Sequence, residues 1–144
     1  MIYLLRHADA ESGNGGDAAR RLTPKGESQA QTAGRALKAM GAGIDACLAS
    51  PKIRAQETAR LACAVLGLEP EVVEELRGGP FDSLRLAAGR GDVLLVGHEP
   101  DFSAEVGRLT GGRVKMRKSG LAIVDGSTLV ALLHPSDLAA LAES

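Results

Sequence analysis

The sequence has few aromatic side chains. It contains no tryptophan, and Tyr3, Phe81 and Phe102 are its only aromatic residues besides histidine. The core must therefore be built from Leu, Val, Ile and Ala. Proteins that bind single-stranded nucleic acid stack bases on aromatic side chains, and a net charge of −1 provides no positive field for a polyanion. Both observations argue against a nucleic-acid partner.

Long hydrophobic runs are also missing. The longest apolar run spans six residues, 61–66, and that at 129–133 spans five, whereas a membrane-spanning helix needs about 20. The N-terminus has no basic segment followed by an apolar one, so we expect no secretory signal. The two cysteines, Cys47 and Cys63, are expected to be free thiols in a chain without an export signal. We therefore expect a cytoplasmic protein with no membrane partner.

The bulk composition fits one domain over residues 1–144, since domains commonly contain about 100–150 residues. Hydrophobic residues make up 44% and charged residues 24% of the chain. A chain of this length can bury a core that needs no disulfide or metal to hold it. No internal repeat or linker is found, and we expect a monomer.

The alternation of apolar runs and helix signals predicts an α/β fold. We expect a three-layer sandwich, in which helices cover both faces of a mostly parallel mixed sheet that is antiparallel at one edge. The antiparallel edge is predicted from two strands joined by Gly126-Ser127, a hairpin signal. The expected strands are 2–6, 44–49, 71–75, 92–96, 121–125 and 128–133, and the expected helices are 24–40, 51–66, 81–90, 99–109 and 136–143.

Two predicted helices begin at a hydroxyl residue followed by proline. Thr23 before Pro24 and Ser50 before Pro51 are each expected to be the N-cap. The first of these helices follows a polar, glycine-rich loop over 9–22, and long loops in compact domains are often functional. Its glycines lack the Lys-Ser/Thr of a nucleotide-binding P-loop, so we interpret them as a source of flexibility.

Three predicted parallel strands end in residues of chemical interest. Arg6 and His7 follow the first strand, Arg54 begins the helix after the second, and His98 follows the strand at 92–96. The carboxyl ends of parallel strands meet at one edge of the sheet, where α/β proteins bind ligands. Arginine side chains and helix N-termini both suit phosphate oxygens. The sequence therefore predicts a phosphate pocket that contains two histidines.

Charge suggests a role for each residue of this pocket. A neutral His7 can attack phosphorus and become a phosphohistidine. His98, Arg6 and Arg54 can stabilise the negative charge of the transition state. This scheme requires no metal, and we expect no cofactor. The alternatives are a structural role for His7 and a metal site that joins His98 to Glu99 or Asp101.

Cys47 is a rival nucleophile. Six residues separate it from Arg54, which is one more than in the Cys-x5-Arg loop of cysteine phosphatases. Cys47 lies inside an apolar strand, however, and Pro51 interrupts the backbone N–H donors that such a loop needs. A buried structural cysteine is the better interpretation.

Three motifs carry a resemblance to a known family. They are Leu-Arg-His-Ala at 5–8, Ser-Pro-x-x-Arg-Ala-x-x-Thr at 50–58 and Val-Gly-His at 96–98. In this order they resemble the histidine phosphatase superfamily (phosphoglycerate-mutase-like). The small size and the segment Arg-Leu-Thr-Pro-Lys-Gly at 21–26 resemble its SixA-type phosphohistidine phosphatases. The resemblance extends from residue 2 to about residue 133.

The resemblance implies His7 as the nucleophile, Arg6 and Arg54 as phosphate ligands, and His98 as the second pocket histidine. The sequence departs from the family in two places. Ala8 replaces the usual glycine after the nucleophile. Many members also carry a glutamate acid/base after the third strand, and neither Glu74 nor Glu75 aligns with it. The remaining candidates for an acid/base group or for the pocket rim are Asp9, Asp17, Glu75 and Lys118.

A missing general acid suits a leaving group that departs easily, such as the nitrogen of phosphohistidine. The resemblance therefore implies a metal-independent phosphatase acting through phospho-His7 on a phosphorylated protein, a histidine-containing phosphocarrier. The alternatives are a phosphatase for a small phosphate ester on the same scaffold, and a non-catalytic phosphate- or phosphoprotein-binding module. The basic cluster at 113–118 is either a solvated face or the pocket mouth, where it would attract an acidic partner.

Overall fold

The elements follow one another in the predicted order. The structure is a computed structural model in which residues 1–13 and 15–143 are described. The strands are β1 (Ile2–Arg6), β2 (Ala46–Ala49), β3 (Glu71–Val72), β4 (Val93–Gly97), β5 (Leu121–Asp125) and β6 (Thr128–Leu133). The helices are α1 (Pro24–Ala39), α2 (Ile53–Leu66), α3 (Ser83–Ala87), α4 (Asp101–Thr110) and α5 (Pro135–Ala142), with 3-10 turns η1 (Asp17–Ala19) and η2 (Glu74–Leu76).

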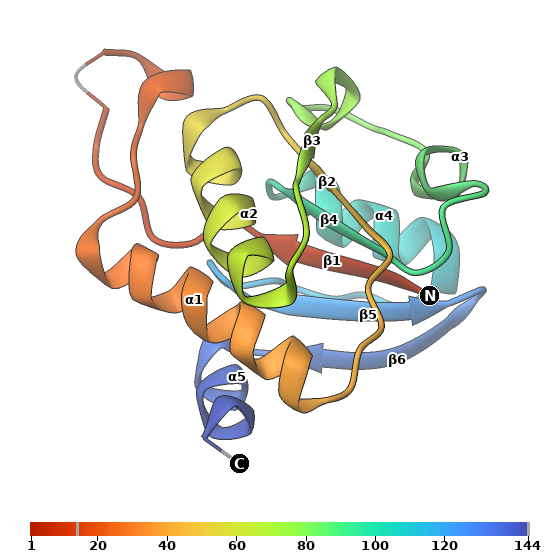
Figure 1. Cartoon of the computed structure of the whole chain (residues 1–144). Helices are drawn as coiled ribbons and strands as arrows, with labels where there is room; N and C mark the ends of the chain where they lie inside the picture. Colours follow the sequence, from red (N-terminus) through yellow and green to blue (C-terminus); the bar gives the residue numbers. More distant parts are fainter. Residues whose placement is uncertain (14, 144) are drawn as a thin grey trace.

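The strands form one mixed sheet in the order β3-β2-β4-β1-β5-β6 (Figure 1). β1 to β4 are parallel to one another, β5 is antiparallel to β1, and β6 is antiparallel to β5. The predicted parallel sheet with an antiparallel edge is confirmed. The C-terminal ends of β1, β2 and β4 consequently lie at the same edge.

Helices cover both faces of the sheet, which confirms the three layers. Tyr3 and Leu5 of β1 pack in a core with residues of α1, α2 and α5, while Ile2 and Leu4 point to the other face and pack with α4. This alternation follows from the two-residue period of a strand. Figure 1 shows α1 and α2 in front of the sheet, α4 behind it and α5 below β6. Burying each such aliphatic side chain contributes about 1.5–3 kcal/mol.

The start of α1 is fixed as the sequence predicts. Thr23 is the N-cap, and its Oγ1 accepts a hydrogen bond of 3.0 Å from the backbone N–H of Gly26. Gly26 also lies against the backbone of Asp9, where a Cβ would overlap the carbonyl oxygen. Thr23 N donates to that same oxygen at 3.1 Å. The end of the 9–22 loop is thereby held against the first turn of α1.

The start of α2 differs from the prediction. The helix begins at Ile53 with Lys52 as its N-cap, and no side chain caps it. The Oγ of Ser50 instead accepts a 3.2 Å hydrogen bond from Lys52 N and lies 2.7 Å from His98 Nε2. The capping prediction for Ser50 was wrong because this hydroxyl takes part in a long-range contact.

Other predicted boundaries shift by a few residues. The expected strand at 71–75 is reduced to β3 and continues into η2, and the expected helix at 81–90 is confined to α3. The glycines at 79, 89 and 91, which flank α3, adopt positive φ angles that do not fit a helix. His134 is the N-cap of α5. No helix among the described residues is long and apolar enough to cross a membrane.

The loop over 9–22 rises from the end of β1 and returns to α1 (Figure 1). Its ends are joined by an antiparallel bridge between Ala10 and Leu22. It contains η1, which contacts α2, and its residue 14 lies outside the described residues. Both cysteines are free and buried, as predicted.

Candidate active site

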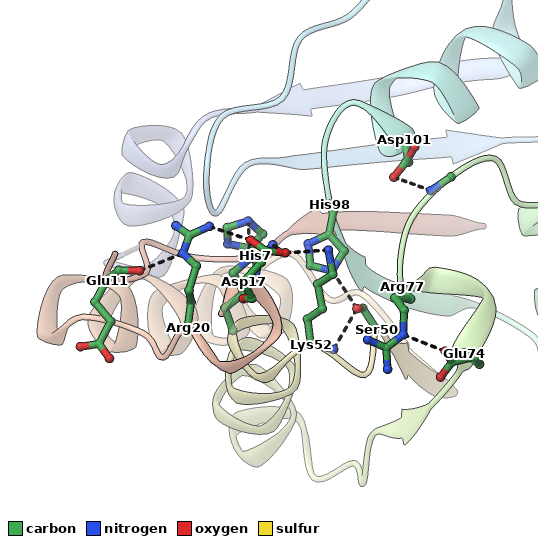
Figure 2. A network of polar contacts seen from close by, with 12 residues as sticks. His7, Glu11, Asp17, Arg20, Ser50, Lys52, Glu74, Arg77, His98 and Asp101 are labelled. Atoms are coloured by element: carbon green, nitrogen blue, oxygen red, sulfur yellow. Dashed lines mark hydrogen bonds and ion pairs between the residues drawn. The ribbon is translucent and has the colours of Figure 1, made fainter. Parts of the chain in front are cut away.

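The four predicted pocket residues converge at the edge where the parallel strands end. His7 follows β1, and its backbone N–H donates to the carbonyl of Gly97 at 2.9 Å. The ring centroids of His7 and His98 are 5.4 Å apart. The Nε of Arg54, the second residue of α2, lies 3.4 Å from Nε2 of His7. Figure 2 shows the two histidines side by side, with Asp17 and Lys52 beside them.

Two contacts define the tautomer of His7. Its Nδ1 lies 2.8 Å from the carbonyl oxygen of Ala8, which can only accept a hydrogen bond. Its Nε2 faces Nε of Arg54, which can only donate one. The proton of the neutral ring is therefore on Nδ1, and the lone pair of Nε2 faces the guanidinium.

The surroundings of His7 also keep the ring neutral. The side chain is buried, with 5% of the residue exposed. Burial is the main cause that lowers the pKa of His7 to about 4, and Arg54 and Arg6 lower it further, against the hydrogen bond to Ala8. At neutral pH the Nε2 lone pair is available for chemistry.

Arg54 is held in place from both ends. Its carbonyl accepts a 2.7 Å hydrogen bond from Oγ1 of Thr58, which in turn accepts from Ala8 N at 3.0 Å. Its guanidinium donates to the backbone oxygen of Asp17 at 2.7 Å and to the Oδ2 atom of Asp17 at 3.3 Å. Thr58, the last residue of the 50–58 motif, thus connects Arg54 to the end of β1.

Arg6 is the last residue of β1 and directly precedes His7, and its positive charge is close enough to lower the pKa of His7. Its Nη1 donates to the carbonyl of Met116 at 3.0 Å, and its Nε is buried without a hydrogen-bond partner among the described residues. A buried N–H group without a partner is costly. An anion at this edge can supply the missing acceptor.

His98 is oriented by Ser50. The Nε2 atom of His98 lies 2.7 Å from Ser50 Oγ, and its Nδ1 is buried without a partner among the described residues. Burial, followed by the neighbouring His7 and Arg54, lowers the pKa of His98 to about 3. His98 is therefore neutral in the free protein, and an anion close to it would raise its pKa.

Asp17 is the acidic residue that reaches this group of cations. Its Oδ2 lies 2.9 Å from Lys52 Nζ and 3.3 Å from Arg54 Nη2, and its Oδ1 lies 3.4 Å from Arg20 Nη1. The hydrogen bond from Lys52, together with Arg54, holds the pKa of Asp17 well below its usual range. The sequence interpretation named Asp17 but missed Lys52 and the role of Ser50. Both lie inside the quoted 50–58 motif.

The other candidate rim residues form no hydrogen bond or ion pair with His7 or His98 in the described part of the chain. Asp9 accepts a 2.7 Å hydrogen bond from Thr23 Oγ1 and lies 3.6 Å from Lys118 Nζ. The Thr23 contact and Lys118 both lower the pKa of Asp9. Glu75 lies in η2, exposed, and its side chain forms no hydrogen bond or ion pair with any residue that the structure describes. The structure therefore does not bring Glu75 to His7.

The rival chemistries find little support in the geometry. Glu99 binds Ser103, and Asp101 accepts a hydrogen bond from Gly79 N, so neither carboxylate is directed to His98. Across residues 1–13 and 15–143, no group of three or more potential ligands could hold a metal ion. A hydrogen bond with Cys63, followed by burial, raises the pKa of the Cys47 thiol, which leaves it unreactive.

Taken together, the edge offers a neutral imidazole lone pair surrounded by cationic N–H donors from Arg6, Lys52 and Arg54. This arrangement suits a phosphoryl group, because its oxygens need positive donors while its phosphorus accepts a nucleophile.

Comparisons with known proteins agree with this geometry. The family model described as the histidine phosphatase superfamily (branch 1) matches residues 2–85. A phosphohistidine phosphatase SixA homologue from Haemophilus influenzae is 34% identical over 128 residues, which cover 78% of this chain and 78% of that protein.

Solved structures share the fold. The protein histidine phosphatase SixA complexed with tungstate matches with a TM-score of 0.82 and 27% identity, covering 95% of this chain and 98% of that one. The alpha-ribazole phosphatase from Shigella flexneri matches with a TM-score of 0.70 and 19% identity, covering 93% and 96%. The second likeness concerns the fold alone.

Proposed function

The chain belongs to the histidine phosphatase superfamily (branch 1) and is a phosphatase, and we propose that it hydrolyses protein phosphohistidine through a phosphoryl intermediate on His7. One observation carries the proposal. The Nε2 atom of a buried, neutral His7 holds a lone pair amid cationic donors at the end of β1. The similarity to SixA-type phosphatases supports the choice of substrate.

In the first step, His7 Nε2 forms a bond to phosphorus and the bond from phosphorus to the substrate nitrogen breaks. The electron pair of that bond leaves with the substrate imidazole, which reacts in the form whose other nitrogen is protonated. The ring therefore departs neutral and needs no general acid. This fits a site in which Asp17 and Asp9 are both held ionised.

In the second step, a water oxygen bonds to phosphorus and the P–Nε2 bond returns its electron pair to His7. The water loses its protons to the phosphate product and to solvent. Arg6, Arg54 and Lys52 stabilise the phosphoryl oxygens in both steps. His98 contributes once the anion beside it has raised its pKa and the ring is protonated.

We also propose that the chain acts as one domain over residues 1–144 in the cytoplasm.

We further propose that these cations make a metal unnecessary. Arg6, Lys52 and Arg54, joined by His98 once it is protonated, supply the positive charge that a divalent ion supplies in metal-dependent phosphatases. Treatment with EDTA is then expected to leave the rate unchanged. A rate that disappears with chelator and returns with added Mg²⁺ would overturn this point.

A direct comparison of substrates tests the choice of phosphohistidine. The value of kcat/KM is measured for a phosphohistidine peptide and for p-nitrophenyl phosphate, phosphoserine and 3-phosphoglycerate under one set of conditions. We expect the phosphohistidine peptide to be hydrolysed at least about 100-fold more efficiently than phosphoserine and 3-phosphoglycerate, because an alkoxide leaving group needs the acid that the site lacks. p-Nitrophenolate departs without an acid, so p-nitrophenyl phosphate is the control for a site that is otherwise active. Equal or higher efficiency on phosphoserine or 3-phosphoglycerate would overturn the proposal.

A further inference from the structure

A strip of cations borders the candidate site. It consists of Arg113, Lys115 and Arg117, which are exposed in the extended segment between α4 and β5. They alternate with Val114 and Met116, which pack into the core on the α4 face of the sheet. The alternation directs all three cationic side chains away from the protein. We call these three residues the basic strip.

The basic strip is fixed relative to the nucleophile. The carbonyl of Met116, between two strip residues, accepts the hydrogen bond from Arg6 Nη1. Two residues after the strip, Ser119 N lies 3.0 Å from the carbonyl oxygen of His7 and 3.1 Å from that of Arg6. These contacts anchor the segment that carries the basic strip to the end of β1, beside His7.

The charge of the basic strip is not neutralised within the protein. None of its three side chains forms an ion pair with a residue in the described part of the chain. The adjacent Lys118, by contrast, pairs with Asp9. On a chain of net charge −1, the strip is a local positive region beside the reacting phosphoryl group.

We propose that the basic strip is a docking surface for an acidic segment next to the phosphohistidine of a protein substrate. The inference rests on the proposed function, which places that phosphohistidine at His7. At physiological salt, charges interact over roughly 8 Å, so acidic residues flanking the phosphohistidine lie within range. A small phosphate compound does not reach the strip, which therefore selects substrates without taking part in the chemistry.

Three phosphohistidine peptides test the inference. They share one sequence except that the four residues flanking the phosphohistidine are Glu, Gln or Lys. The enzyme with its native sequence is expected to hydrolyse the Glu peptide about 10-fold more efficiently than the Gln peptide at low salt, mostly through KM. The Lys peptide is expected to be the poorest substrate, and 0.5 M NaCl should abolish the ranking.

A triple charge reversal, R113E/K115E/R117E, is expected to invert this ranking. The matched control R35E/K38E/R60E makes the same change in net charge at exposed positions of α1 and α2. The control should retain the preference for the Glu peptide. Hydrolysis of phosphoramidate, which is too small to contact the strip, should be equal in all three proteins.

The outcomes separate the docking surface from the proposed function. If the native enzyme hydrolyses phosphoramidate but none of the peptides, the proposed substrate is wrong. If it hydrolyses the peptides without ranking them, or if the strip and control variants behave alike, the docking surface is wrong. Two further results would also overturn the docking surface. One is loss of phosphoramidate hydrolysis in the strip variant alone. The other is tight oligonucleotide binding that depends on the strip, without any ranking of the peptides.

Discussion

Arg54 directs its Nε–H at Nε2 of His7 across 3.4 Å, although 47 positions separate the two residues in the sequence. The same guanidinium donates to Asp17 through its two terminal nitrogens. Arg54 therefore contacts both the lone pair of the proposed nucleophile, His7, and Asp17, whose carboxylate competes with a phosphoryl group for the same donors.

The first prediction concerns the protonation of His7. In the free protein, NMR titration of the histidine ring signals should give a midpoint near 4 for His7, below the usual value of about 6.5. Burial and the nearby arginines are the cause. A midpoint of 6 or above would contradict the view that the ring is held neutral, and the His7→Asn variant identifies the signal.

The same shift predicts how stability depends on pH. Since the pKa of His7 is lower in the folded than in the unfolded protein, the unfolded state binds more protons between about pH 6.5 and 4. The free energy of unfolding should therefore fall as the pH falls through this window, by on the order of 3 kcal/mol for His7. Urea unfolding of the native protein and of His7→Asn at several pH values measures the difference.

The second prediction concerns Asp17. Its carboxylate occupies donors of Lys52 and Arg54 that a phosphate needs. Asp17→Asn should therefore bind inorganic phosphate or tungstate about fivefold more tightly, measured by calorimetry, because a nearby negative charge is removed. Weaker binding would contradict the competition assigned to Asp17, and unchanged binding with a large loss of kcat would instead make Asp17 a catalytic acid or base.

The third prediction concerns Ser50, a positioning residue for His98. Ser50→Ala should lower kcat by about 10- to 100-fold with little change in KM, because His98 loses the contact that orients its ring. Ser50→Thr should restore most of the rate, and the exposed Ser136→Ala serves as a control. The ring ¹⁵N shifts of His98 should change in Ser50→Ala, and unchanged shifts would contradict the assigned role.

The fourth prediction uses two glycines with different surroundings. An added Cβ at Gly26 overlaps the backbone of Asp9, whereas nothing lies within 4 Å of one at Gly43. Gly26→Ala should destabilise the protein by about 3 kcal/mol, and Gly43→Ala should change its stability by less than about 0.5 kcal/mol. Thermal unfolding measures both, and equal melting temperatures would contradict the close packing of α1 against the 9–22 loop.

The fold was largely predictable because its signals are local. The hairpin strands 121–125 and 128–133 have the bounds that their apolar runs and the Gly126-Ser127 turn predict. Thr23 and Pro24 begin α1 as expected. Ser50 and Pro51 carry the same signal, yet α2 begins later, because His98 and Lys52 use the serine hydroxyl.

The candidate site was predictable where each residue follows a strand. Arg6 ends β1, while His7 and His98 directly follow β1 and β4, and parallel pairing brings them to one edge. The contacts of Asp17 with Lys52 and Arg54 were not predictable, since they depend on how a long loop closes over α2. Neither the hydrophobic periodicity nor a helix-capping residue in the sequence specifies how this loop closes over α2. Glu75 was named from its place after a strand, and the turn at η2 leaves it exposed.

The most direct measurement is the detection of the phosphoryl enzyme. After brief incubation with phosphoramidate and alkaline quenching, trypsin separates the three histidines into peptides 7–20, 91–108 and 119–144. We predict an acid-labile phosphoryl group on peptide 7–20 alone, and neither label nor turnover in His7→Ala. Label on a peptide that contains His98 or His134, or turnover retained by His7→Ala, would contradict the account.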